Sequence, residues 1–251
     1  MTPAGRKPFL DILSAYLLKN KNIIDEHHWW ANTTNPTELF NLQILCEKYP
    51  DFFKTIQPTV EPDIHDPLNT TYQFYNNYNQ PKTIYIRFDD DICYMEKNAL
   101  PNLLDFHTEY PDYFMVFPIL INHISNNLFF DQKIPYLNKR GKAGLELHKK
   151  FLNQESLYQP FHHIQIDSGA AFFGHRMQCC CWKGENFQDI NKDEIYDQYV
   201  RKPKTTRKSL AICGNSIMVH FGYKEQLPVL RPSGIYQEYY NLKPKTDFPL
   251  F

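Results

Sequence analysis

The sequence lacks a long apolar run. Its mean hydropathy is −0.54, and the longest strongly apolar stretch lies near residues 113–121. A helix that crosses a bilayer needs about 20 consecutive apolar residues. We therefore expect no membrane span.

Glycine is scarce, with 9 among 251 residues and no regular period. This excludes a collagen-like repeat, and the 42% hydrophobic and 16% aromatic residues exclude a disordered chain. Neither sign of charge predominates, because 27 Lys and Arg residues stand against 28 Asp and Glu residues, a net charge of −1. A dedicated nucleic-acid-binding protein carries a basic excess, so we expect no nucleic-acid partner.

The amino-terminal residues lack the apolar core of a secretory signal. The six cysteines also lack the spacing of a disulfide framework or a zinc ribbon, since three of them are consecutive. They are Cys46, Cys93, Cys179, Cys180, Cys181 and Cys213. We expect reduced thiols that pack as small apolar side chains, in a cytoplasmic protein.

Strand-like and helix-like segments alternate along the chain. This predicts the α/β fold class, with a mixed, mostly parallel sheet flanked by helices. The expected helices are 7–18, 35–49, 100–107 and about 145–152, and the expected strands are 23–31, 83–88, 113–121, 162–173, 178–182 and 211–221. The last strand bends at Gly214 and Asn215, and we expect 54–81 and 224–251 to be irregular.

Three consecutive aspartates, Asp89, Asp90 and Asp91, directly follow the apolar strand 83–88. Adjacent carboxylates repel one another, so this aspartate triplet is costly unless water or a cation neutralises it. Ligands of open α/β sheets bind at the carboxyl ends of strands, and Mg²⁺ and Mn²⁺ favour carboxylate and phosphate oxygens. The triplet indicates a divalent-metal site, with a solvated acidic turn as the alternative.

His220 lies within the apolar segment 216–221. A histidine in such a setting is more often a hydrogen-bonded core residue than a metal ligand. Together with the aspartate triplet, it becomes a candidate third ligand.

Four segments follow one another in the sequence: Thr-Pro-Ala-Gly-Arg at 2–6, Trp-Ala-Asn-Thr-Thr-Asn-Pro at 30–36, Tyr-Ile-Arg-Phe-Asp-Asp-Asp-Ile at 85–92 and Val-His-Phe at 219–221. In this order they resemble a group of microbial and viral glycosyltransferases with the GT-A fold. The acidic segment resembles the Asp-X-Asp motif of nucleotide-sugar-dependent enzymes and is the most specific of the four. The resemblance implies one Rossmann-like GT-A domain over 1–251, with a nucleotide-binding half at 1–121 and an acceptor-binding half at 122–251.

The resemblance implies a metal-dependent enzyme that moves a hexosyl or deoxyhexosyl group from a nucleotide diphosphate sugar to a glycan or glycoconjugate, with Mn²⁺ or Mg²⁺ as cofactor. Asp91 would bind the metal directly, His220 would complete the site, and Asp89 would touch the donor ribose or reach the metal through water. Such an ion stabilises the negative charge of the leaving diphosphate. The implied donor-binding residues are Thr2, Pro3, Arg6, Asn32, Asp89 and Asp90. Lys224 could add positive charge from a loop, with a solvated surface cation as the alternative.

An inverting transferase also needs a carboxylate that takes the proton of the acceptor hydroxyl. Glu194 is the candidate, and Asp193 and Asp167 compete with it. The alternative for the acidic stretch 190–200 is an exposed helical face. A retaining enzyme needs no such base, and the sequence leaves the stereochemistry open.

The amino terminus departs from the GT-A pattern, in which a central first strand precedes the Thr-Pro-Ala-Gly-Arg-like loop. Met1 stands immediately before Thr2, so we expect this strand to be missing or truncated. A non-catalytic protein that binds nucleotide or glycan is therefore one alternative function. A phosphoryl-transfer hydrolase with an aspartate nucleophile is another, although such enzymes usually place Thr, not Ile92, after the acidic loop.

Overall fold

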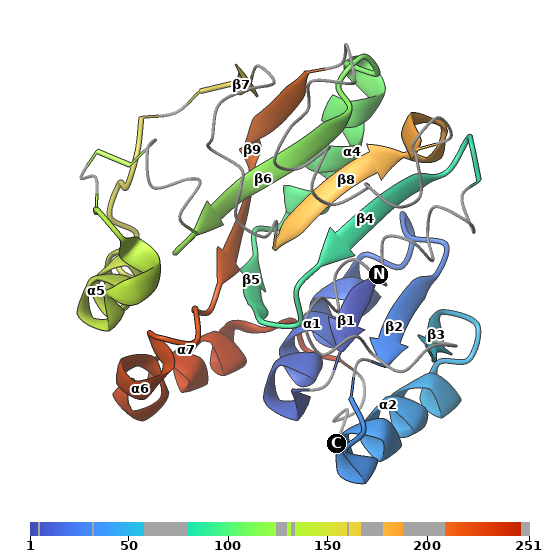
Figure 1. Cartoon of the computed structure of the whole chain (residues 1–251), viewed down its shortest axis with the longest axis horizontal. Helices are drawn as coiled ribbons and strands as arrows, with labels where there is room; N and C mark the ends of the chain where they lie inside the picture. Colours follow the sequence, from blue (N-terminus) through green and yellow to red (C-terminus); the bar gives the residue numbers. More distant parts are fainter. Residues whose placement is uncertain are drawn as a thin grey trace.

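The computed structural model describes residues 1–4, 6–31, 33–57, 80–123, 130–131, 134–159, 161–166, 178–187 and 209–246. Its strands form two sheets (Figure 1). Sheet A has the order β1 (Thr2–Ala4), β2 (His27–Ala31), β3 (Phe53–Ile56). Sheet B has the order β4 (Ile84–Phe88), β8 (Cys179–Lys183), β6 (Met115–Ile121), β9 (Leu210–His220), β5 (Ile92–Met95), with β7 (His163–Ile166) also paired to β9.

Most strands point the same way. Sheet A is wholly parallel, as is the β6–β9 pair, whereas the other pairs of sheet B are antiparallel. Because β4 and β6 both run antiparallel to β8 between them, β4, β6 and β9 share one direction. The expected mostly parallel sheet is therefore confirmed for sheet A, while pairing within sheet B is mainly antiparallel.

Met1 joins the two sheets. Its amino group donates to the carbonyl of Ile86 at 2.6 Å, and its own carbonyl accepts from the amide of Phe88 at 2.9 Å. This is the hydrogen-bond pattern of parallel neighbours, so β1 runs in the same direction as β4. The carboxyl ends of β1, β2, β4, β6 and β9 consequently lie along one edge.

The first strand is short rather than missing. Thr2 and Pro3 belong to β1, which pairs with β2 in a register that sets Thr2 opposite Trp29. The resemblance to GT-A enzymes implies a loop at these two residues, and the structure corrects this to a strand. Three residues are enough here, since β1 is held on both sides, by β2 and by β4.

The long helices lie where the sequence predicts them. They are α1 (Lys7–Lys19), α2 (Pro36–Lys48), α4 (Ala99–Glu109) and α5 (Gly141–Leu152). In α2 the side chain of Asn35 accepts from the amide of Thr37 at 3.0 Å, and Pro36 occupies the first turn, where its missing N–H costs no hydrogen bond.

The expectation of an irregular carboxyl-terminal segment is wrong for residues 227–242. The chain forms α6 (Leu227–Leu230), a 3₁₀ turn (Arg231–Ser233) and α7 (Ile235–Leu242). Pro228 and Pro232 hide this pattern in the sequence, yet both lie in first turns, where proline is tolerated. The buried face of α7, which includes Ile235 and Tyr239, supplies the packing that stabilises it.

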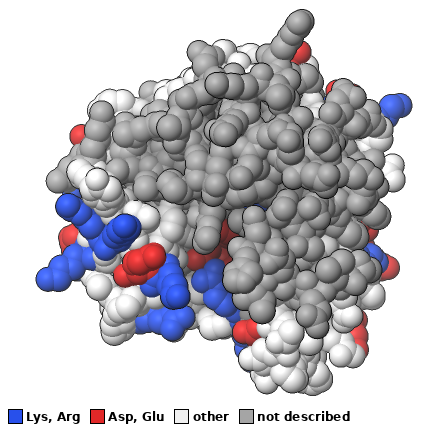
Figure 2. Space-filling model, viewed as in Figure 1, with Lys and Arg blue, Asp and Glu red and all other residues white. Residues whose placement is uncertain are grey.

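Basic and acidic side chains are unevenly placed on one face of the molecule. Figure 2 shows Lys and Arg gathered at the lower left, where Figure 1 draws α5 and α6. Lys142 and Lys149 of α5, together with Arg140 and Arg231 nearby in the fold, are exposed. Acidic and basic groups also meet near the centre of this face, where Figure 1 draws the ends of β4 and β5.

Among the residues that the structure describes, no helix combines the length and the apolar character that crossing a bilayer requires.

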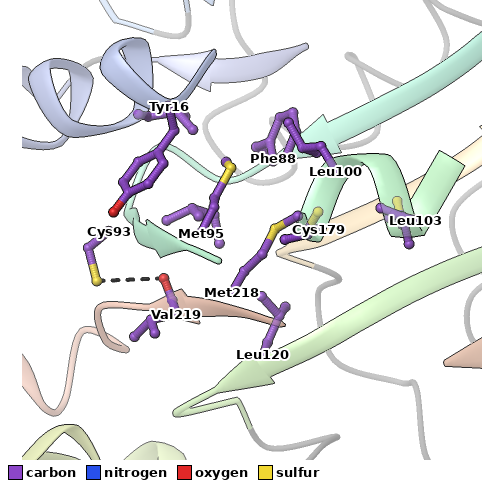
Figure 3. Close-up of a cluster of buried hydrophobic side chains, with 14 of the residues drawn as sticks. Tyr16, Phe88, Cys93, Met95, Leu100, Leu103, Leu120, Cys179, Met218 and Val219 are labelled. Atoms are coloured by element: carbon purple, nitrogen blue, oxygen red, sulfur yellow. Dashed lines mark hydrogen bonds between the residues drawn. The ribbon is translucent and has the colours of Figure 1, made fainter. Parts of the chain in front are cut away.

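The hydrophobic core lies between the helices and sheet B. Strand β6 is buried at every position, which confirms the predicted central strand. Helix α4 packs on β9, β6 and β8, while α1 and α7 pack on β5. Figure 3 shows Tyr16 of α1, Met95 of β5 and Met218 of β9 among the side chains that fill this space. All six cysteines are free thiols, and every one except Cys46 is buried, as the sequence predicts.

Candidate metal centre

The aspartate triplet forms the tight connection from β4 to β5, at the edge where the parallel strands end. Strand β5 pairs antiparallel with the end of β9, in a register that sets Ile92 opposite His220. The amide of Phe221 also donates to the carbonyl of Asp91 at 2.9 Å. This ladder brings the triplet beside His220, which comes from the other end of the chain.

Three side chains converge at this point, as the sequence predicts. Asp89, Asp91 and His220 each offer one ligand atom, and these atoms all lie within 4.8 Å of one another. Nε2 of His220 is 3.4 Å from Oδ2 of Asp91, and both side chains are only 3% exposed, whereas that of Asp89 is 24% exposed. Two carboxylates and an imidazole are ligands that several divalent ions accept, so the cluster could hold a metal ion.

One carboxylate oxygen of Asp91 lacks a partner that a bound cation would supply. Its Oδ1 atom is buried and has no hydrogen-bond partner among the described residues. A buried carboxylate oxygen without a partner costs free energy, because it has lost water and gained nothing in return. A divalent ion held between Asp91, Asp89 and His220 would supply that partner, so the residues present fit a metal.

Two arginines balance the acidic charge. Arg87 is buried in β4 and donates to Oδ1 of Asp89 at 2.5 Å. Arg6, in the N-cap position of α1, donates through Nε to Oδ2 of Asp90 at 2.8 Å and also pairs with Oδ1 of that residue. Nη2 of Arg6 also lies 3.3 Å from Oδ2 of Asp91. Asp90 is thus committed to Arg6, which leaves Asp91 and Asp89 to face a cation.

The ionisation of the cluster reflects its burial. Burial raises the pKa of Asp89, which Arg87 partly opposes, and it raises the pKa of Asp90, which Arg6 partly opposes. Burial alone would lower the pKa of Arg6, but the carboxylates of Asp91 and Asp90 outweigh it, and that pKa is raised. Metal binding favours the ionised carboxylates, so we expect binding to strengthen as the pH rises.

The other predicted site residues fall into two groups. Thr2 is fully buried in β1, Pro3 lies beside it, and Lys224 is exposed in the turn between β9 and α6. Their contacts with a donor stay predictions. Asn32, Asp167, Asp193 and Glu194 lie outside the described residues.

Two residues of this site, Arg87 and Asn122, are not among those that the sequence predicts. Arg87 stands two positions before Asp89, and residues two apart in an extended chain share a face, so the ion pair could have been anticipated. Asn122 is the other residue, because its main-chain carbonyl lies 3.2 Å from Nδ1 of His220. No local signal marks it, since the contact joins the ends of β6 and β9.

Comparison with models of known protein families finds no family that matches this chain, and comparison with curated proteins finds no match either. Function is therefore inferred from the site itself.

Proposed function

We propose that the chain is a metal-dependent glycosyltransferase of the GT-A type, which transfers a hexosyl or deoxyhexosyl group from a nucleotide diphosphate sugar to a glycan or glycoconjugate. The convergence of Asp89, Asp91 and His220 at the carboxyl edge of the sheet is the observation that carries this proposal. Ligands of open α/β sheets bind at that edge. The cofactor in this proposal is Mn²⁺ or Mg²⁺.

The chain's own residues have distinct roles in this proposal. Asp91, Asp89 and His220 hold the ion, which when bound neutralises charge on the donor diphosphate. Asp90 orients Arg6 through the two contacts to its guanidinium. Arg6 would then be available to bind a phosphate oxygen of the donor, because its side chain remains 39% exposed.

Charge beyond the cluster also supports an anionic donor. Lys224 lies shortly after His220, in the turn that follows β9, and is exposed. It could therefore approach a phosphate of the donor from the end of β9. Figure 2 shows basic side chains gathered where Figure 1 draws α5 and α6, and these add a positive field on this face of the molecule. Thr2, Pro3 and Asn32 remain proposed donor contacts.

The acceptor side of the proposal rests on the second half of the chain. Residues 122–251 would bind the acceptor, and Glu194 or Asp193 would remove the proton of its hydroxyl if the reaction inverts the anomeric centre. A non-catalytic nucleotide-binding or glycan-binding protein, and a phosphoryl-transfer hydrolase, are the competing functions.

The proposal is tested by incubating the purified chain with nucleotide diphosphate hexoses and deoxyhexoses, with Mn²⁺ or with EDTA, and measuring nucleoside diphosphate release. We expect release that depends on Mn²⁺ and falls at least about a hundredfold in Asp91→Asn, the loss expected when a metal ligand is removed. Asp112→Asn is the matched control, because Asp112 is exposed in the turn before β6, at the opposite edge.

Each other outcome points to a competing function. Activity that survives both EDTA and Asp91→Asn overturns the proposal. Calorimetric binding of a nucleotide without turnover on any acceptor favours the non-catalytic protein. Metal-dependent hydrolysis of a generic phosphate ester, without sugar transfer, favours the hydrolase.

A further inference from the structure

A buried network of neutral polar side chains lies directly behind the candidate metal centre. It joins Asn122 after β6, His148 of α5, Gln226 before α6 and Tyr239 of α7 to the main chain of Phe221. All four residues are fully buried. Phe221 follows the metal-ligand candidate His220, so the network contacts the same end of β9 that carries the ligand.

The proton position on His220 follows from one contact. Nδ1 of His220 lies 3.2 Å from the main-chain carbonyl of Asn122, and a carbonyl oxygen can only accept. Nδ1 of His220 therefore carries a proton. When the ring is neutral, this leaves on Nε2, 3.4 Å from Oδ2 of Asp91, the lone pair that can bind a metal. A histidine that binds a metal commonly donates its other N–H to a carbonyl in this way.

The backbone of Asn122 adopts a left-handed conformation. Its φ is +60°, in the left-handed region that asparagine tolerates better than most residues. This conformation turns the chain immediately after β6. A conformation that most residues avoid must be held in place by its surroundings.

The side chain of Asn122 holds it. Its amide nitrogen donates to Oε1 of Gln226 at 2.9 Å, and Nε2 of Gln226 donates back to Oδ1 of Asn122 at 3.0 Å. The same nitrogen of Asn122 donates to the carbonyl of Phe221 at 3.0 Å. Asn122 therefore contacts the end of β9 in two ways. Its carbonyl accepts from the ring of His220, and its side chain donates to the carbonyl of Phe221.

His148 and Tyr239 complete the network, and Nε2 of His148 also lies 3.2 Å from the amide nitrogen of Asn122. Nε2 of His148 lies 2.8 Å from the carbonyl of Phe221, and its Nδ1 lies 2.9 Å from the hydroxyl of Tyr239. Because the carbonyl only accepts, Nε2 donates, and Nδ1 accepts the hydroxyl proton. Every polar atom of the Asn122–Gln226 pair has a partner, so the network is rigid.

We propose that Asn122 is a positioning residue of the metal centre: its main-chain carbonyl fixes the proton of His220 on Nδ1, and its side chain, locked to Gln226, holds that carbonyl and the end of β9 in place. This inference rests on the proposed metal centre. It does not depend on whether the bound metal serves glycosyl transfer, phosphoryl transfer or binding alone.

The test compares two variants that each lose a side-chain amide near one end of β6. Asn122→Gly removes the locking side chain but keeps the carbonyl and accepts the positive φ. Asn186→Ala is the matched control, because the amide of Asn186 donates to the carbonyl of Phe114 at 2.9 Å, at the other end of β6. Two readouts are measured: Mn²⁺ affinity by calorimetry, and the imidazole nitrogen NMR shifts of His220 in the metal-free protein.

We expect wild type and Asn186→Ala to bind Mn²⁺ alike and to show His220 protonated on Nδ1. In Asn122→Gly we expect Mn²⁺ affinity to fall by roughly tenfold or more, with a mixture of the two His220 tautomers. If Asn122→Gly does not fold, Gln226→Met serves instead, since it breaks the reciprocal amide pair with a side chain of similar size. Unchanged affinity and an unchanged tautomer in both Asn122→Gly and Gln226→Met overturn the inference.

Failure of the proposed function gives a different result. If Mn²⁺ binds but no sugar is transferred, the glycosyltransferase proposal fails while the positioning role of Asn122 stands or falls on the comparison above. If wild type binds no Mn²⁺, the metal centre itself fails, and this inference fails with it whatever the tautomer of His220.

Discussion

Nε2 of His220 lies 3.4 Å from Oδ2 of Asp91, and Nδ1 of the same ring donates to the main-chain carbonyl of Asn122. An imidazole nitrogen and a carboxylate, both of which can bind a metal ion, therefore face the same point. Such an arrangement is costly without a cation and favourable with one.

Replacing Arg6 by alanine should separate metal binding from donor binding. Arg6 places positive charge 3.3 Å from Oδ2 of Asp91, and this charge opposes a divalent ion at the same carboxylate. In Arg6→Ala we expect Mn²⁺ alone to bind roughly three- to tenfold more tightly, and nucleoside diphosphates to bind more weakly in its presence. Calorimetric titration of each ligand checks this, with Lys142→Ala as the control for loss of an exposed positive charge. Weaker Mn²⁺ binding in Arg6→Ala would contradict the prediction.

Stability should fall in mild acid because of His148. Burial lowers the pKa of His148 from 6.5 to about 4, so between these values the unfolded chain binds a proton that the folded chain does not. Above pH 6.5, His148 is neutral in both states and does not lower the free energy of unfolding. As the pH falls from 6.5 toward 4, the unfolded chain takes up a proton at His148, and the free energy of unfolding falls by roughly 3 kcal/mol in total.

Urea unfolding at several pH values, in EDTA, measures this dependence. His148→Gln keeps a neutral group that can donate and accept, so we expect a shallower fall in stability than in wild type. His162→Gln, at an exposed histidine, should leave the pH dependence unchanged. Equal slopes for wild type and His148→Gln between pH 6.5 and 4 would show that His148 is not the group responsible.

Thiol labelling of the native protein should divide the cysteines sharply. Burial raises the pKa of Cys93, Cys179, Cys181 and Cys213, and it is the thiolate that reacts. Cys46 is the one cysteine that is not fully buried, although its pKa is also raised by burial. We expect Cys46 to react first, and the other five to react only on unfolding. Mass spectrometry of the labelled peptides checks this, and rapid labelling within Cys179, Cys180 and Cys181 would contradict the packing of β8.

Gly214 should not tolerate a side chain. It lies at the bend of β9, where its amide donates to the carbonyl of His162 at 2.8 Å. A Cβ atom at this position would come within 1.9 Å of the carbonyl oxygen of Phe161, and main-chain atoms cannot move aside without breaking the β7–β9 pairing. We expect Gly214→Ala to lose about 3 kcal/mol or more of stability.

Gly234→Ala is the comparison for this variant. Gly234 has open space around it and a φ of +83°, so only backbone strain of about 1–2 kcal/mol is expected there. Thermal unfolding of both variants tests the difference. Equal losses would show that the close approach of Phe161 to Gly214 is not what excludes a side chain.

Local pattern was sufficient for much of the fold. The unbroken apolar run of β6, the Asn35 cap with Pro36 in α2, and the abrupt change from apolar residues to aspartates at the end of β4 are all visible within a few residues. The carboxylates and His220 were identified as metal-ligand candidates for the same reason, since residue type alone fixes which atoms can bind a cation.

Other elements depended on contacts that no short window contains. Strand β5 is only four residues long and was not predicted, yet its pairing with β9 sets Ile92 opposite His220. Helix α7 is only 8 residues long and follows two prolines, and it is stabilised by the burial of Ile235 and Tyr239. The role of Asn122 is invisible until β6 and β9 lie side by side.

The sequence by itself determined the local elements and the chemical character of the candidate ligands, because periodicity and residue type are properties of neighbouring positions. Only the tertiary structure decided which of these groups meet. The register of β5 against β9, and the turn at Asn122, depend on which of many possible strand pairings buries the most apolar surface. That choice is made by the whole chain at once.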